Sequence, residues 1–338
     1  MNMQRRRLGG SDLEVSELGL GTMTFGRETD EATSRLMVDV YLEAGGNFVD
    51  TADVYGGRGA TEEIVGRAIA GRRDEVILAT KGRMAMSDAA EDRGASPAYL
   101  RRAVEASLRR LGTDVIDLYQ IHWPDPSVPA EATFAALNDM VNEGKLRYYG
   151  VSNYLGSALQ RAIDVCEFGE LAPVVAHQIQ YSLVQRDTEL ETLPQCREHN
   201  IGVIAWGPLG GGVISGKYRS DQPPPPDTRL GGPQTLAKLT ERSQAIAAEV
   251  AEVGRAIGKS PAQVALNWVL HRPGVTAPLV GARTVEQLTD NLGAAGWQLQ
   301  PELVRRLDEV SARSIPYPQS TYQLLGIASY EPAVAGID

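Results

Sequence analysis

The stretch Val76-Ile-Leu-Ala-Thr-Lys81 is followed by a helical segment that begins at Ser96-Pro97 and stops at Gly112, and then by Val115-Ile-Asp-Leu-Tyr-Gln-Ile-His122. Both apolar runs are nearly continuous instead of alternating, which indicates strands buried on both faces, as in a parallel sheet. A serine cap, a proline in the first turn and a glycine at the end are typical helix boundaries. This stretch therefore predicts a strand, a helix and a second, parallel strand.

The same alternation continues along the rest of the chain. Candidate strands lie at 18–22, 47–52, 76–81, 115–122, 146–153, 173–181, 202–206 and 277–281. Candidate helices lie at 30–44, from the N-cap Thr61 onward, at 96–111, 130–143, 157–168, 189–199, 236–257 and 260–271, and from Thr284 onward. Eight strand–helix units in about 275 residues fit a barrel better than an open sheet. We therefore predict an α/β fold, a (β/α)₈ TIM barrel.

The remaining segments are predicted to decorate one domain that spans 1–338. Its core is expected at about 17–295, with extra helices late in the chain and a C-terminal helix and tail at about 296–338. A short N-terminal hairpin, Arg7-Leu8 against Val15-Ser16, is expected to plug the barrel floor. The proline-rich segment 221–232 is interpreted as an insertion loop, and the tail from Ser311 onward as a loop over the barrel mouth.

Composition and charge limit the function classes. The 338 residues are 43% hydrophobic and 22% charged, which is typical of a soluble globular enzyme. A net charge of −10, from 33 Lys and Arg against 43 Asp and Glu, argues against nucleic-acid binding, which needs a basic face. The two cysteines, Cys166 and Cys196, have no histidine cluster beside them, so no metal site is predicted. No stretch is long and apolar enough to span a membrane, and a cytoplasmic location is expected.

In a (β/α)₈ barrel, functional side chains lie at the carboxyl ends of the strands and in the loops that follow them. Asp50 lies near the end of the second candidate strand, and Tyr55 follows in the next loop. Lys81 ends the third strand and His122 ends the fourth. We predict that these four polar side chains meet at the barrel mouth as a catalytic group. Asp53, in contrast, is interpreted as a carboxylate that caps the loop.

The four residue types suit the reduction of a carbonyl group. Lys81 ends an apolar strand, so its ammonium needs a carboxylate partner, and Asp50 is the expected one. A paired lysine beside Tyr55 favours the phenolate and makes the phenol a better acid near neutral pH. His122 would orient or polarise the same substrate oxygen. Such a group can protonate a carbonyl oxygen while a cofactor supplies a hydride.

Several longer motifs resemble those of a known family. They are Gly46-Asn-Phe-Val-Asp-Thr-Ala-Asp-Val-Tyr-Gly56, Thr61-Glu-Glu-Ile-Val-Gly66, Gln120-Ile-His-Trp-Pro124 and Gly144-Lys-Leu-Arg-Tyr-Tyr-Gly-Val-Ser-Asn153. Together with Lys81, and in this order, they resemble the aldo-keto reductases over essentially the whole chain. The loops that begin at Trp206 and Gly281 are similar to the bacterial branch related to the potassium-channel β subunits. The family's Asp, Tyr, Lys and His tetrad matches Asp50, Tyr55, Lys81 and His122.

The resemblance also implies an NADPH or NADP⁺ cofactor that is bound in an extended form without a Rossmann motif. The near-match Gly19-Leu-Gly21 has Thr24 where the third glycine would stand. The implied cofactor-binding residues are Thr22; Ser152, Asn153, Gln178 and Trp206 at the nicotinamide; Gly207, Pro208, Leu209, Gly211, Ser215 and Lys217 at the pyrophosphate; and Gly281, Arg283, Gln287 and Asn291 at the adenosine end.

Two positions depart from the family pattern at the adenosine end. Many relatives carry a lysine where Gly281 stands and an arginine where Gln287 stands, and both help to select the 2′-phosphate. Arg283 is the cation left nearby in the sequence, and the N-terminus of the helix from Thr284 adds a positive dipole. The expected preference for NADPH is therefore weaker than in a reductase with both charges.

Two functions from different classes remain open. The first is NADPH-dependent reduction of an aldehyde or ketone, with Tyr55 as the proton donor; the alternative is a catalytically weak, NADP(H)-binding regulatory subunit. A sugar-phosphate isomerase on the same barrel would need a catalytic glutamate at a strand end, and none is found. The expected partner is a small carbonyl compound, and a homo-oligomer is left open. Candidate substrate-binding residues are Met23, Phe25, Met84 and Trp123.

Overall fold

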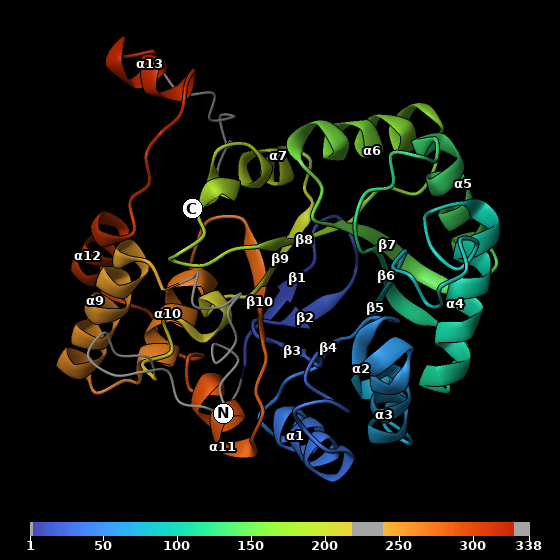
Figure 1. The fold of residues 1–338 in the computed structure, drawn as a ribbon, viewed down its shortest axis with the longest axis horizontal. Coiled ribbons are helices and arrows are strands. Elements are labelled where there is room, and N and C mark those ends of the chain that lie inside the picture. The colour runs from blue at the N-terminus through green and yellow to red at the C-terminus, as the bar shows by residue number, and fades with distance from the viewer. Residues whose placement is uncertain (1–2, 218–238, 328–338) are drawn as a thin grey trace.

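Eight parallel strands close into one barrel at the centre of the molecule (Figure 1). The structure is a computed structural model that describes residues 3–217 and 239–327. The order of the strands around the barrel is β10-β3-β4-β5-β6-β7-β8-β9. They are β3 (Gly19–Gly21), β4 (Phe48–Asp50), β5 (Ile77–Gly82), β6 (Ile116–Ile121), β7 (Leu146–Ser152), β8 (Ala176–Gln180), β9 (Gly202–Trp206) and β10 (Val275–Val280). The predicted (β/α)₈ barrel is confirmed.

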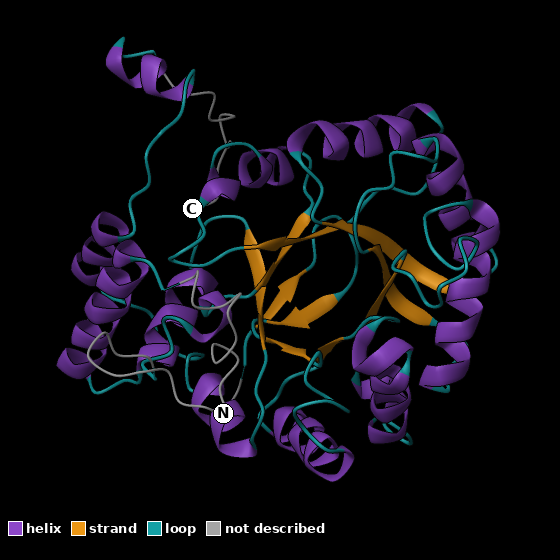
Figure 2. Cartoon of the chain, viewed as in Figure 1, coloured by secondary structure: helices purple, strands orange, loops and turns teal. Residues whose placement is uncertain are grey.

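The longer helices form a ring outside the strands (Figure 2). They are α1 (Glu31–Glu43), α3 (Ala60–Ala68), α4 (Pro97–Leu111), α5 (Ala130–Asn142), α6 (Gly156–Phe168), α7 (Thr192–Glu198), α9 (Glu241–Ile257), α10 (Pro261–Leu270), α11 (Val285–Leu292) and α12 (Pro301–Val310). Short elements are α2 (Tyr55–Arg58), α13 (Gln319–Leu324) and the 3₁₀ turns η1 (Arg73–Glu75), η2 (Asp187–Glu189) and η3 (Gly210–Gly212). The predicted N-caps Ser96, Ser260 and Thr284 each accept a backbone hydrogen bond.

The N-terminal hairpin closes the barrel at the end opposite the mouth. β1 (Arg5–Arg7) pairs antiparallel with β2 (Glu14–Ser16). Leu8, Leu13 and Val15 are almost completely buried and pack with the side chains that fill the barrel interior. The predicted floor plug is therefore confirmed, and its position leaves the carboxyl ends of the strands as the open end.

The two faces of β5 point into different layers of the core. Ala79 lies in the smaller hydrophobic cluster inside the barrel, and Lys81, two residues further along, faces the same side. Thr80 faces outward, where its hydroxyl donates to Glu62 of α3 at 2.6 Å. The larger hydrophobic cluster fills the space between the strands and the ring of helices. This alternation places a catalytic candidate and a separate polar layer on opposite sides of one strand.

Several predicted boundaries differ from those in the structure. Thr61 is not an N-cap: α3 begins at Ala60 after Gly59, and the Thr61 hydroxyl donates to the backbone oxygen of Phe25. The helix predicted at 189–199 is a 3₁₀ turn followed by α7. The helix predicted at 236–257 begins at Glu241, where Thr240 caps it. The predicted insertion loop at 221–232 lies outside the described residues.

The C-terminal segment takes a different course from the predicted one. After α12, Ser311 is buried and Arg313 pairs with Asp187 at 3.0 Å, but the residues that follow run away from the ring of helices, and α13 lies outside it (Figure 1). Tyr317 is 82% exposed and Leu324 is 85% exposed, so this segment buries little apolar surface on the barrel. The prediction of a tail over the mouth is therefore wrong for residues 314–327, and the rest of the tail lies outside the described residues.

Candidate active site

A buried ion pair joins two strands at the open end of the barrel. The Lys81 ammonium donates to Asp50 Oδ2 at 2.6 Å and to the backbone oxygen of Thr51 at 2.8 Å. The Lys81 side chain is 0% exposed and that of Asp50 is 2% exposed. Burial alone would lower the pKa of Lys81, but the charge of Asp50 and the nearby Tyr55 raise it above its usual value. Lys81 is therefore held as a cation inside the protein.

The second oxygen of Asp50 is also hydrogen-bonded. Gln178 Nε2 donates to Asp50 Oδ1 at 2.8 Å, and Gln120 Nε2 donates to it at 3.3 Å. The register of β5 and β6 places Gln120 directly beside Lys81. The sequence predictions did not include Gln120, although it lies two residues before His122 and therefore on the same, inner face of the barrel. These donors fix the orientation of the carboxylate and satisfy its second oxygen.

Tyr55 lies over the ion pair at the start of α2. The Lys81 Nζ atom is 5.2 Å from the centroid of the Tyr55 ring. Gly56 and Gly57 follow with φ of +66° and +88°, values that side-chain-bearing residues rarely adopt. The sharp turn they allow brings the chain back to the mouth directly after β4. The structure thus brings Tyr55, Lys81 and Asp50 together, as the strand positions predicted.

His122 completes the group beside Tyr55. The two rings meet edge to face, with centroids 5.9 Å apart. Burial, followed by the positive charges of Lys81 and Arg83, lowers the pKa of His122 to about 3. His122 is therefore neutral near pH 7. Its Nδ1 atom is buried and has no hydrogen-bond partner in the described residues.

A hydrogen-bonded row of side chains extends from His122 along the next strand ends. Asn153 has a left-handed backbone with φ of +59°, and its Nδ2 donates to the backbone oxygen of His122 at 3.0 Å. Trp206 Nε1 donates to Asn153 Oδ1 at 2.9 Å, which fixes the indole. The Ser152 hydroxyl donates to the backbone oxygen of Gln178 at 2.9 Å. Four of the residues assigned to the nicotinamide thus lie together beside the tetrad, whereas Thr22 is buried with its hydroxyl on the backbone oxygen of Asp50.

The loops after β9 and β10 have a glycine-rich, open surface. A side-chain carbon added at Gly207 would meet its nearest neighbour, Gln180 Cγ, only at 4.0 Å. One added at Gly281 would meet the backbone oxygen of Gly21 at 3.9 Å. Gly207, Gly210, Gly211 and Gly212 all have positive φ. The open space beside the backbone at Gly207 and Gly281 fits the close approach of a phosphate-bearing ligand, whereas a side-chain carbon at Gly210 would lie 2.6 Å from Val184 Cγ2.

The candidate residues at the adenosine end form hydrogen bonds that shape the loop between β10 and α11. Gln287 Oε1 accepts from the backbone nitrogen of Arg283 at 3.1 Å, and Asn291 Nδ2 donates to the backbone oxygen of Gly281 at 3.4 Å. Thr284 caps α11 by accepting from the backbone nitrogen of Gln287. Gln287 and Asn291 therefore shape the segment that carries Arg283, while the start of α11 offers backbone N–H groups and a positive dipole.

The candidate substrate-binding residues do not share one environment. Trp123 is 44% exposed beside His122, and Met23 and Met84 are partly exposed. Phe25, in contrast, is 1% exposed and lies in the larger hydrophobic cluster between barrel and helices. Its ring is part of the core and is not offered to a ligand, because the loop after β3 turns it inward.

Comparisons with known proteins agree with this geometry. Residues 17–312 match the model of the aldo/keto reductase family. The chain belongs to the aldo/keto reductase family. It is 38% identical over 320 residues to the uncharacterized oxidoreductase YrpG of Bacillus subtilis (strain 168), and the match covers 91% of this chain and 96% of that protein. The chain is thus an oxidoreductase of this family.

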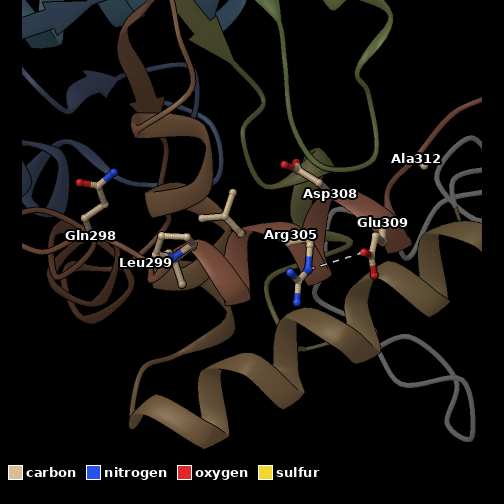
Figure 3. A pocket seen from close by; sticks show the side chains of 8 residues that line it. Gln298, Leu299, Arg305, Asp308, Glu309 and Ala312 are labelled. Carbon is tan, nitrogen blue, oxygen red and sulfur yellow. Dashed lines mark ion pairs between the residues drawn. The ribbon is translucent and has the colours of Figure 1, made fainter. Parts of the chain in front are cut away.

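Two clefts of this aldo/keto reductase lie away from the tetrad. One, of about 620 Å³, lies along α12 and is lined by Leu299, Val304, Arg305 and Asp308 among others (Figure 3). The other, of about 630 Å³, lies between the ends of α3 and α4.

Within residues 3–217 and 239–327, no helix is both long and apolar enough to cross a membrane, and no three His, Cys, Asp or Glu side chains cluster as metal ligands would.

Proposed function

We propose that this aldo/keto reductase is an NADP(H)-dependent reductase of small aldehydes or ketones, with Tyr55 as the proton donor. The observation that carries the proposal is the buried Lys81–Asp50 ion pair beneath the Tyr55 ring. A lysine held as a cation at this position stabilises the phenolate that remains when Tyr55 gives up its proton. The similarity to the bacterial branch related to potassium-channel β subunits is part of the same proposal.

Each residue of the tetrad has a role in the proton transfer. When bound, NADPH supplies the hydride that reduces the carbonyl carbon. The Tyr55 phenol donates its proton to the carbonyl oxygen, which becomes the hydroxyl of the product. Lys81 stabilises the phenolate, and Asp50 holds Lys81 in place through its 2.6 Å hydrogen bond. A proton from water then restores the phenol.

His122 orients the substrate as a neutral ring. Its low pKa keeps it uncharged at neutral pH, so it can donate a hydrogen bond without adding a second positive charge beside Lys81. Trp123, partly exposed and next in the chain, is proposed as a wall of the substrate site. This arrangement favours a polarised carbonyl oxygen between the Tyr55 and His122 rings.

The cofactor is proposed to lie along the open glycine loops. Asn153, Ser152 and Gln178 would hold the nicotinamide amide beside Trp206, and the backbone of 207–212 would approach the pyrophosphate. Arg283 and Lys217 would supply positive charge for the phosphates. Since Gly281 and Gln287 supply none, we propose that NADPH is preferred over NADH only moderately.

The Tyr55→Phe variant tests this function. We expect kcat for NADPH-dependent reduction to fall by about 10²–10⁴-fold, because the proton donor is lost while the ring remains. NADPH binding, followed by tryptophan fluorescence, should remain close to that of the natural protein. Tyr317→Phe is the matched control, since Tyr317 lies on the exposed C-terminal segment and should leave kcat unchanged.

Two results would contradict the proposal. One is a Tyr55→Phe variant that keeps more than a few per cent of the turnover. The other is natural protein that binds NADPH tightly yet reduces no member of a panel of aldehydes and ketones, which would favour the alternative of a cofactor-binding regulatory subunit.

A further inference from the structure

A second buried carboxyl lies directly behind the catalytic lysine. Asp53 follows Asp50 by three residues, and its backbone nitrogen donates to the backbone oxygen of Lys81 at 3.0 Å. Its side chain is 0% exposed. Neither carboxylate oxygen has a hydrogen-bond partner within the described part of the chain. The oxygens thus lack the well-formed backbone hydrogen bond that a loop cap would accept, although the N–H of Val54, the next residue, lies close enough to act on the carboxyl.

A glycine in β5 leaves the space for a phenol hydroxyl beside this carboxyl. A side-chain carbon added at Gly82 would lie 1.9 Å from the hydroxyl oxygen of Tyr119 and 3.4 Å from Asp53 Oδ2. The Tyr119 hydroxyl is also buried and has no hydrogen-bond partner among the described residues. Gly82 thus lets a phenol and a carboxyl share the outer face of β5, one residue after Lys81. Two such groups without partners in one buried place are unusual.

The charged and titratable groups around Asp53 come from four elements. They are Glu62 on α3, Tyr99 and Arg110 on α4, Lys81 on β5 and Tyr119 on β6. Arg110 contacts Glu62 at 2.6 Å, and the Glu62 carboxylate also accepts from Thr80. Arg110 is therefore paired with Glu62, and among the described residues no cation contacts the Asp53 carboxyl.

This environment favours the neutral form of Asp53. Burial, and then the negative charge of Glu62, raise the pKa of Asp53 to about 8. The charges of Arg110 and Lys81 and the N–H of Val54 act in the opposite direction. Asp53 is therefore mainly protonated at neutral pH and ionises under mildly alkaline conditions.

We infer that Asp53 is a positioning residue for the reaction. Its carboxyl, on the outer side of β5, affects how strongly Tyr55, beside Lys81, holds its proton. The inference rests on the proposed role of Tyr55. Coupling between two titrating groups is reciprocal, so the effect of the Lys81 charge on Asp53 implies an equal effect of an ionised Asp53 on Lys81. An added negative charge stabilises the ammonium and opposes formation of the phenolate. Reduction, which needs the phenol, therefore persists to higher pH.

The Asp53→Asn variant tests this through a pH profile. Asparagine keeps the shape of the neutral carboxyl but cannot ionise. We expect the alkaline limb of kcat for reduction to move to lower pH by about half a unit or more, so that the ratio of rates at pH 9 and pH 7 falls about threefold. Asp53→Leu should move the limb in the same direction. Asp74→Asn is the matched control, since it removes one exposed carboxylate on η1, and its profile should match the natural one.

A second measurement does not depend on turnover. The ionisation of Tyr55 is followed by tyrosinate absorbance, as the difference between each protein and the same protein carrying Tyr55→Phe. Asp53→Asn should lower the pH at which Tyr55 loses its proton by a similar amount. An unchanged Tyr55 titration, or an unchanged alkaline limb in both Asp53 variants, overturns the inference. These outcomes differ from failure of the proposed function, which shows as turnover that survives Tyr55→Phe.

Discussion

The two faces of β5 hold buried carboxylates in opposite situations. On the inner face, Asp50 accepts hydrogen bonds from Lys81, Gln120 and Gln178. On the outer face, Asp53 has no hydrogen-bond partner within the described residues, although it is equally buried. A buried charge is stable only when it is paired and hydrogen-bonded. The inner carboxyl is therefore paired with a cation and hydrogen-bonded, whereas the outer one has a raised pKa that keeps it neutral near pH 7.

Removing the inner cation should have the largest effect. Lys81→Met leaves Asp50 buried without its positive partner, so we expect unfolding to become easier by about 3–5 kcal/mol and kcat to fall by at least about 10³-fold. Urea unfolding and NADPH oxidation measure the two effects. Lys145→Met is the control, because Lys145 pairs with Glu105 and Glu143 at the surface and should cost at most about 1 kcal/mol. If Lys81→Met loses no more free energy of unfolding than Lys145→Met, the inner ion pair does not differ from a surface ion pair.

The outer face can be tested by filling the space at Gly82. Gly82→Ala places a carbon 1.9 Å from the Tyr119 hydroxyl oxygen, so we expect a destabilisation of about 1–3 kcal/mol. Tyr119→Phe removes that oxygen and should recover part of the loss in the double variant, as measured by urea unfolding. Additive effects of the two changes would show that the hydroxyl does not occupy this space.

The effect that is smallest per pH unit is on the pH dependence of stability. The folded-state pKa of Asp53 is raised, so its contribution to stability is fully present below the unfolded pKa of about 4 and is lost as pH rises through about 8. Asp53→Asn, which cannot lose a proton, should therefore gain stability relative to the natural protein between pH 4 and pH 8, at about 1.4 kcal/mol per pH unit. Thermal unfolding across this range measures the difference. A constant difference at all pH values would mean that Asp53 does not titrate in the fold as described.

Much of the inner face could be predicted from strand positions. Lys81 and His122 end apolar runs, and the carboxyl ends of barrel strands meet at one mouth, so their proximity follows from the fold. Gln120 was missed, although its place two residues before His122 puts it on the same face. Phe25 was assigned to the substrate site because it follows β3, yet the loop turns its ring into the core.

The sequence alone determined the order of strands and helices, the hairpin floor and the tetrad, because residue periodicity and strand ends are local features that any (β/α)₈ barrel repeats. Tertiary structure alone decided which carboxyl is paired with a cation. Asp50 and Asp53 lie three residues apart in one motif. Only the packing of strands and helices around them pairs Asp50 with Lys81 and pairs Arg110 with Glu62 instead of Asp53. The path of residues 314–327 could not be predicted either, since a segment with few buried contacts carries no periodic signal of where it packs.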